Sequence, residues 1–133
     1  MTLSLSLQIA KLKAAGYLVA TDYFGIDATG TEDVAVPFFD LCEVATALGG
    51  AHIIFPPGTY LIDYDTTIPQ DVTVVMQEGA VFNISSGISL EIDGGIEAGL
   101  YQIFKGAGTV TGLPKVKEVY PEWWGGGLIR IPG

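Results

Sequence analysis

The sequence predicts a mostly β protein, built as a short solenoid of stacked parallel strands with a helix over its first end. Eighteen glycines and seven prolines lie mainly between short apolar runs, which indicates many turns. After residue 50, apolar residues recur about every 15 to 20 positions, the length of one coil of a parallel β-helix. An amphipathic stretch just before these repeats predicts the helix. Because the repeat is loosely spaced, a β-sandwich or barrel remains the alternative.

Composition and charge exclude several functions. The 133 residues fit one domain, and 49% of them are hydrophobic, enough to form a core. The net charge is -9, and residues 14–104 contain no Lys or Arg. We therefore expect no binding to nucleic acid and no membrane insertion. Neither a signal peptide nor an apolar run long enough to span a membrane is evident, so we expect synthesis in a cytoplasm.

The first part of the chain predicts a short helix over residues 3–15. Apolar residues at spacings of four and three precede Gly16, which would end the helix: Leu5, Ile9 and Leu12. Alternating Leu and Ser at residues 3–7 also permits a strand, but the good helix formers that follow favour the helix. A brief strand is expected at residues 17–20, and a loop at residues 27–31.

A second helix is predicted to begin between Thr31 and Pro37 and to end at Leu48, before two glycines. Its apolar positions fall on one face, suited to cover the open end of the first coil: Val34, Phe38, Leu41, Cys42, Ala45 and Leu48. Cys42 is the only cysteine, so no intrachain disulfide or thiolate cluster can form. We expect it to be a small buried hydrophobe and not a catalytic thiol.

After residue 50 the pattern changes to short strands, which we predict at residues 52–55, 59–62, 72–76, 80–84, 88–92, 95–98, 100–104, 109–111 and 116–120. They are too closely spaced for crossover helices between them. Two series of apolar residues indicate which positions stack on one another: Ile54, Val74, Leu90 and Val110, and in phase with them Leu61, Val81 and Ile96.

Two parts of the sequence resemble a known family. FGIDATGTED at residues 24–33, the helix behind it, and IIFPPGTYLI at residues 53–62 resemble the pectate-lyase-like β-helix of phage tailspikes, where such a loop precedes a capping helix and FPPGTY forms the first coil. IEAGLYQIF at residues 96–104 and VYPEWWG at residues 119–125 resemble a segment that lies ahead of the catalytic β-helix in tailspikes and tail-fibre proteins. The Lys-Gly-Asp-Gly core of the family's loop is matched only in part.

The resemblance implies a right-handed parallel β-helix with an N-terminal capping helix. Residues 1–23 would be an N-terminal helix and linker, residues 24–125 the capped β-helix module, and residues 126–133 a C-terminal tail. Tailspikes are homotrimers, so a trimer in the virion tail, in contact with other tail proteins, is implied. Its function would be structural, linking the virion to the receptor-binding or depolymerase region. The alternative is a β-helix protein that binds or depolymerises bacterial surface polysaccharide, as a glycoside hydrolase or lyase.

Carboxylates are the only residues whose pattern points to catalysis. Asp63 and Asp65 lie two apart, as do Glu91 and Asp93, so each pair would share a face of an extended segment. A carboxylate pair in a cleft can cleave a glycosidic bond. Both pairs adjoin turns, however, where acids usually cap backbone groups. We therefore expect no catalytic residue, cofactor or metal, and keep these four acids for the enzymatic alternative.

Three aromatic residues are candidates for contact with a glycan or another subunit: Tyr60, Trp123 and Trp124. Tyr60 follows the Pro-Pro-Gly turn and is expected to pack beside it. On an extended chain Trp123 and Trp124 would face opposite ways, so one can be buried while the other meets a subunit, a domain or a sugar. Packing at a subunit or domain junction is preferred. His52, the only histidine, is expected to be hydrogen-bonded and not a base or metal ligand.

Overall fold

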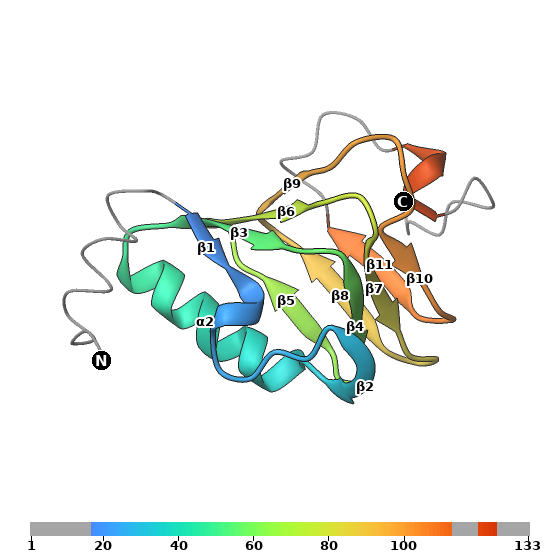
Figure 1. The fold of residues 1–133 in the computed structure, drawn as a ribbon, viewed down its shortest axis with the longest axis horizontal. Helices are drawn as coiled ribbons and strands as arrows, with labels where there is room; N and C mark the ends of the chain where they lie inside the picture. Colours follow the sequence, from blue (N-terminus) through green and yellow to red (C-terminus); the bar gives the residue numbers. More distant parts are fainter. Residues whose placement is uncertain (1–16, 113–119, 125–133) are drawn as a thin grey trace.

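A computed structural model describes residues 17–112 and 120–124 (Figure 1). The helix expected at residues 3–15, nearly all of the strand expected at 116–120, and the tail at 126–133 lie outside these ranges. The strands are β1 (Tyr17–Val19), β2 (Thr29–Asp33), β3 (Ala51–Phe55), β4 (Gly58–Ile62), β5 (Thr66–Ile68), β6 (Val72–Met76), β7 (Ala80–Ile84), β8 (Ser89–Ile92), β9 (Gly95–Glu97), β10 (Phe104–Lys105) and β11 (Thr109–Gly112). The helices are the 3-10 helix η1 (Ala20–Asp22), the α-helix α2 (Ala35–Ala47) and the 3-10 helix η2 (Pro121–Trp124).

The strands form three sheets, and every pair of neighbouring strands in the described ranges is parallel. The first sheet has the order β1-β3-β6-β9, the second β10-β7-β4-β2 and the third β11-β8-β5. Each consecutive trio from β3 onward therefore gives one strand to each sheet, always in the same sequence. Paired residues in these trios lie 20 to 24 positions apart in the chain. The mostly β prediction is confirmed, and the pairing is parallel, unlike that of an antiparallel meander.

The core lies between the three sheets and is centred on a run of aromatic rings. Alternate residues of β3, β4, β6 and β7 are buried, as expected for strands with one face inward. Ring centroids are 5.6 Å apart for Phe38 and Phe55, 5.0 Å for Phe55 and Phe82, 6.4 Å for Phe82 and Phe104, and 4.9 Å for Phe104 and Trp124. We call this run the aromatic column. It connects α2 to η2 through the interior of the molecule.

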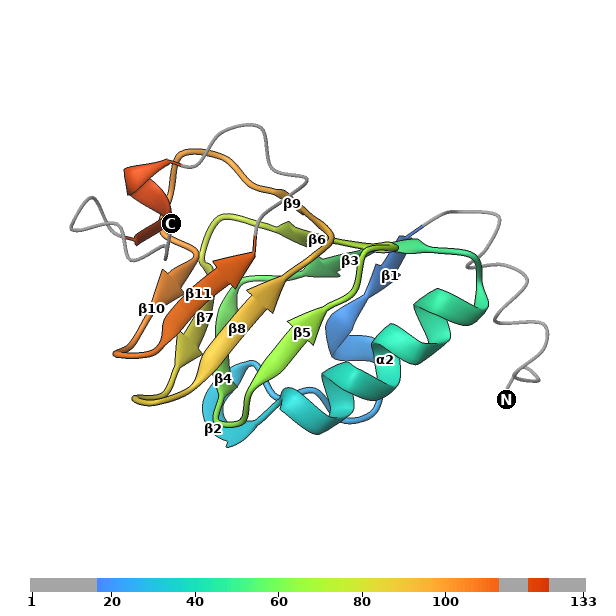
Figure 2. The ribbon, with the colours of Figure 1, turned by 180° about the vertical axis from the view of Figure 1, so that it is seen from behind.

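The helix α2 matches the sequence prediction. All six apolar positions assigned to its inner face are buried, and the chain leaves it through Gly49 and Gly50, both at positive φ. The helix lies beside β5 (Figure 2), and Phe38 reaches the aromatic column from it. The helix α2 thus lies next to β5, which is the outermost strand of the third sheet. The strands in the corresponding position of the first and second sheets are β1 and β2.

Three local predictions were wrong. The loop expected at residues 27–31 gives way at Thr29 to β2, which pairs with β4 at Thr29–Thr59 and Asp33–Leu61. The strand β5 was missed. Residues 100–103 are not a strand, and only the last residue of that prediction lies in β10. The strand expected at residues 17–20 is confirmed as β1, which pairs with β3 in the first sheet.

The stacked positions were also assigned one residue or more out of register. Ile54 pairs with Val75, and Val74 pairs with Ile96. Leu90 belongs to the third sheet, where it pairs with Val110 as expected. A shift of one residue exchanges the inner and outer faces of a strand, so an apolar residue on an outer face misleads the alignment.

The substitution Phe82→Ala tests how much the aromatic column contributes to the stability of the fold. Phe82 is almost fully buried between Phe55 and Phe104, and its truncation should lower the free energy of unfolding by about 3 to 5 kcal/mol. The neighbouring Val81 points to the outer face, so Val81→Thr should cost less than about 1 kcal/mol. Urea unfolding of both variants measures the difference, and equal losses would show that the column is not the main packing element.

Candidate functional site

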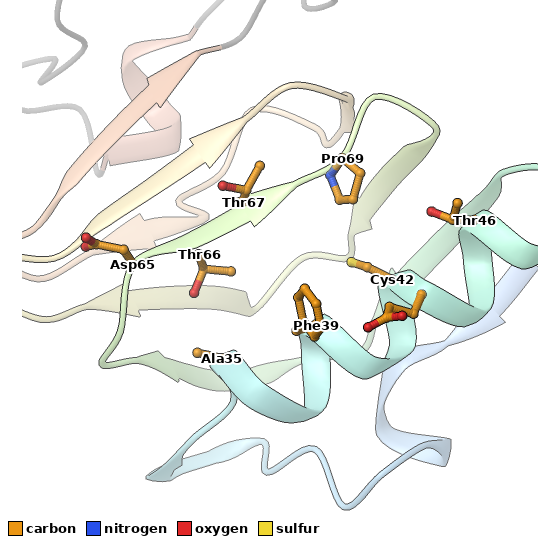
Figure 3. A pocket seen from close by; sticks show the side chains of 9 residues that line it. Ala35, Phe39, Cys42, Thr46, Asp65, Thr66, Thr67 and Pro69 are labelled. Atoms are coloured by element: carbon orange, nitrogen blue, oxygen red, sulfur yellow. The ribbon is translucent and has the colours of Figure 1, made fainter.

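A groove of about 570 Å³ lies between α2 and β5. We call it the α2/β5 groove. Figure 3 shows side chains from both elements pointing into it. Its lining combines apolar, hydroxyl and acidic side chains: Ala35, Phe39, Cys42, Glu43, Thr46, Asp65, Thr66, Thr67 and Pro69. This volume lies within the range of small-molecule sites, about 300 to 1,000 Å³.

Of the first predicted carboxylate pair, only Asp65 lines this groove. Its carboxylate accepts a hydrogen bond of 2.9 Å from the backbone N–H of Ser89 at the start of β8. Asp63 does not line the groove, and its own N–H donates to the Asp33 carboxylate at 2.7 Å. Both residues lie in the bend between β4 and β5 and not on a strand. The contacts that hold the two residues in place therefore join the first strand trio to β2 on one side and to β8 on the other.

The second pair, Glu91 and Asp93, is brought together on the outer side of the third sheet. The hydrogen bond between the two side chains, followed by the negative charge of Asp93, raises the pKa of Glu91 above its usual range. Glycosidases hold their carboxyl groups about 5 to 10 Å apart, so that a sugar or a water fits between them. Carboxyl groups in hydrogen-bond contact are closer than either glycosidase geometry requires.

Cys42 is 3% exposed and packs with the buried face of α2. Burial, with a smaller contribution from the charge of Asp71, raises the pKa of its thiol to about 12. A thiol with this pKa is almost entirely protonated near neutral pH and is a poor nucleophile. The residue behaves as the small buried hydrophobe that the sequence predicts.

Tyr60 lies inside the protein with no exposed surface. Its ring packs edge-on against Phe55 at 4.9 Å, and its hydroxyl donates a hydrogen bond of 2.6 Å to the carbonyl of Pro56. Burial raises the pKa of Tyr60 to about 12. The side chain therefore closes the Pro-Pro-Gly turn from within, and its ring does not meet the surface.

The two tryptophans lie in the 3-10 helix η2, not on the extended chain that the sequence argument assumed. Trp123 is 2% exposed, and its indole N–H donates to the Gly99 carbonyl at 3.0 Å. Its own carbonyl accepts the N–H of Ile103 at 2.9 Å. Trp124 is only partly buried and lies against Phe104 at the end of the aromatic column. One ring is thus buried and the other partly exposed, as expected, although a helical turn places them.

His52 is the one histidine of the chain, and it lies on the outer face of the first sheet. Its Nε2 atom is 2.9 Å from Glu97 Oε2, and its ring packs against Tyr17 with centroids 5.1 Å apart. Among the described residues, no group of three or more His, Cys, Asp or Glu side chains could hold a metal ion. No described helix has the length and apolar character needed to cross a membrane.

Sequence reasoning missed most residues of the α2/β5 groove, including Phe39, Thr46 and Pro69. The short alternation at residues 66–68, bounded by an acid and a proline, was the available signal for β5. Nothing in the sequence shows that β5 passes beside α2. The comparisons with protein-family models, curated proteins and solved structures give no match for this chain.

Asp27 is the most heavily hydrogen-bonded carboxylate in the described part of the chain. It accepts the backbone N–H groups of Thr29, Thr31 and Glu32 and the hydroxyls of both threonines. The hydrogen bond from the Thr29 hydroxyl, then that from the Glu32 N–H, hold the pKa of Asp27 far below its usual range. The residue fixes the turn that leads into β2.

The lowered pKa of Asp27 predicts a pH-dependent contribution to stability. A carboxyl whose pKa is lower in the folded state contributes fully above its unfolded pKa, about 3.9, and loses that contribution as the pH falls below it. Asp27→Asn should therefore be less stable than the wild type at pH 7, and the difference should shrink below about pH 4. Urea unfolding at several pH values measures this, and a difference that stays constant with pH would contradict it.

Proposed function

We propose that this chain is a structural and assembly module of the kind found in phage tailspikes and tail fibres. In this proposal the three sheets are the faces of a short right-handed parallel β-helix, the strand trios are its coils, and α2 is its cap. The observation that carries the proposal is the repeated order of the trios around one aromatic column. The FPPGTY and YPEWWG segments, which resemble that family, lie at the turn closed by Tyr60 and in η2.

The proposed module forms a homotrimer and links other tail proteins to a receptor-binding or depolymerase region. Support comes from the outer side of the first sheet, where Val19, Ile54 and Val75 lie side by side and are each partly exposed. The equivalent outer row of the third sheet is polar and consists of Thr67, Glu91 and Thr111. An aliphatic row on one sheet favours contact between copies there, because burying apolar surface stabilises association.

Light scattering on the purified chain tests the trimer. We expect three times the 14.0 kDa mass of one chain. Val75→Asp should shift the mass toward the monomer, because a carboxylate would be desolvated in the contact and would face Glu97 on the neighbouring strand. Thr111→Asp, on the polar row, is the matched control and should stay trimeric. A wild-type chain that remains monomeric at all concentrations would remove the main support for an assembly role.

The structural proposal and the enzymatic alternative make opposite predictions for the cleavage of polysaccharide. Incubation of the protein with capsular polysaccharide or lipopolysaccharide should release no new reducing ends, because the Glu91–Asp93 pair does not have glycosidase spacing. Sustained release that Glu91→Gln or Asp63→Asn abolishes would replace the structural proposal with a depolymerase. Glu78→Gln, a change far from both pairs in sequence, serves as the control for nonspecific effects.

A further inference from the structure

A large aromatic side chain in the α2/β5 groove is exposed to solvent. Phe39 lines the groove and is 61% exposed (Figure 3). The α2 residues that line the groove lie at positions 35, 39, 42, 43 and 46, so the groove follows one stripe of the helix for about 16 Å. On its other side β5 is the last strand of the third sheet among the described residues. Covering this stripe would remove apolar surface from water and shield the edge of β5.

The charges around the groove are negative. Glu43 and Asp65 line it, and Thr46 donates a hydrogen bond to Asp71 at its far end. Lys105 is the single Lys or Arg in the described ranges, and the other five lie outside them. Two of those five, Lys11 and Lys13, belong to the segment that precedes β1.

That segment also has a suitable apolar pattern and a suitable point of entry. As a helix, the segment would place Leu5, Ile9 and Leu12 in one stripe about 11 Å long, with Leu3 and Leu7 outside that stripe. Tyr17, the first residue of β1, pairs with His52, only five positions after α2 ends at Ala47. The segment therefore joins the described part of the protein close to the end of α2 at which Thr46 lines the groove.

We propose that residues 3–15 form an amphipathic helix that docks in the α2/β5 groove of the same chain. Its apolar stripe covers Phe39, and Lys11 and Lys13 lie near Glu43 and Asp65. The docked helix completes the cap that α2 begins. This proposal does not depend on the trimer or on the function proposed above, since it concerns contacts within one chain.

Limited digestion of the native, full-length chain by trypsin tests the docking. Trypsin cuts after Lys and Arg, and residues 14–104 contain neither, so early cuts near the N-terminus report on Lys11 and Lys13 alone. Cleavage of a docked segment follows the population of its open form. We expect Phe39→Ser to accelerate these cuts about tenfold, whereas Phe24→Ser should not. Phe24 is also exposed, at 53%, and does not line the groove.

A second pair of variants tests the other side of the contact. Ile9→Ser should accelerate cleavage as Phe39→Ser does, and Ala10→Ser, on the opposite face of the predicted helix, should leave the rate unchanged. Urea unfolding confirms that each variant remains folded. Equal cleavage rates in the wild type and Phe39→Ser would overturn the proposal. Protection that grows with protein concentration would also overturn it, because the occupant would then be a second copy.

Discussion

The aromatic column is the constraint on which the rest of the structure depends. Each pair of parallel strands joins residues 20 or more positions apart, so a long loop must close before any contact forms. Closing the loop costs conformational entropy, and packing in the interior must offset that cost. Large rings, one from each successive strand trio, fill the narrow space between the sheets: Phe55, Phe82 and Phe104. Phe38 and Trp124 extend the same contacts into α2 and η2. The two ends of the molecule are therefore fixed by the same packing as its middle.

Three carboxylates accept hydrogen bonds from backbone N–H groups next to strands. Asp27 accepts N–H groups in the turn before β2, Asp33 accepts the N–H of Asp63, and Asp65 accepts the N–H of Ser89. Two of these bonds join residues 24 and 30 positions apart. Carboxylates that bind backbone donors between trios stabilise the stacking and need no catalytic explanation. The candidate catalytic residue Asp65 thus has a structural role in the contacts observed.

The sequence was sufficient where local patterns agree with tertiary packing. The stretch that became α2 carries apolar spacing, a glycine stop and a buried face, and the strands β6 and β7 lie at residues 72–76 and 80–84 as predicted. It was insufficient for β2, because Gly30 and the neighbouring threonines indicate a loop. This segment is a strand because it pairs with β4, which the local sequence does not show. It was insufficient for register too, because Ile54 and Val75 are apolar on the outer face. The groove could not be found without β5, and β5 has only three residues.

Charge and apolar surface together limit where another copy of the chain can bind. The outer row of the third sheet carries Glu91, with Asp93 next to it, so copies that meet there would bring carboxylates together in a chain of net charge -9. The row of Val19, Ile54 and Val75 on the first sheet places no charge in the centre of a contact, and Glu97 lies only at its end. His52 holds Glu97 at 2.9 Å on the same face. Association through the first sheet would therefore bury aliphatic side chains and leave the acids at the rim, where water still screens them.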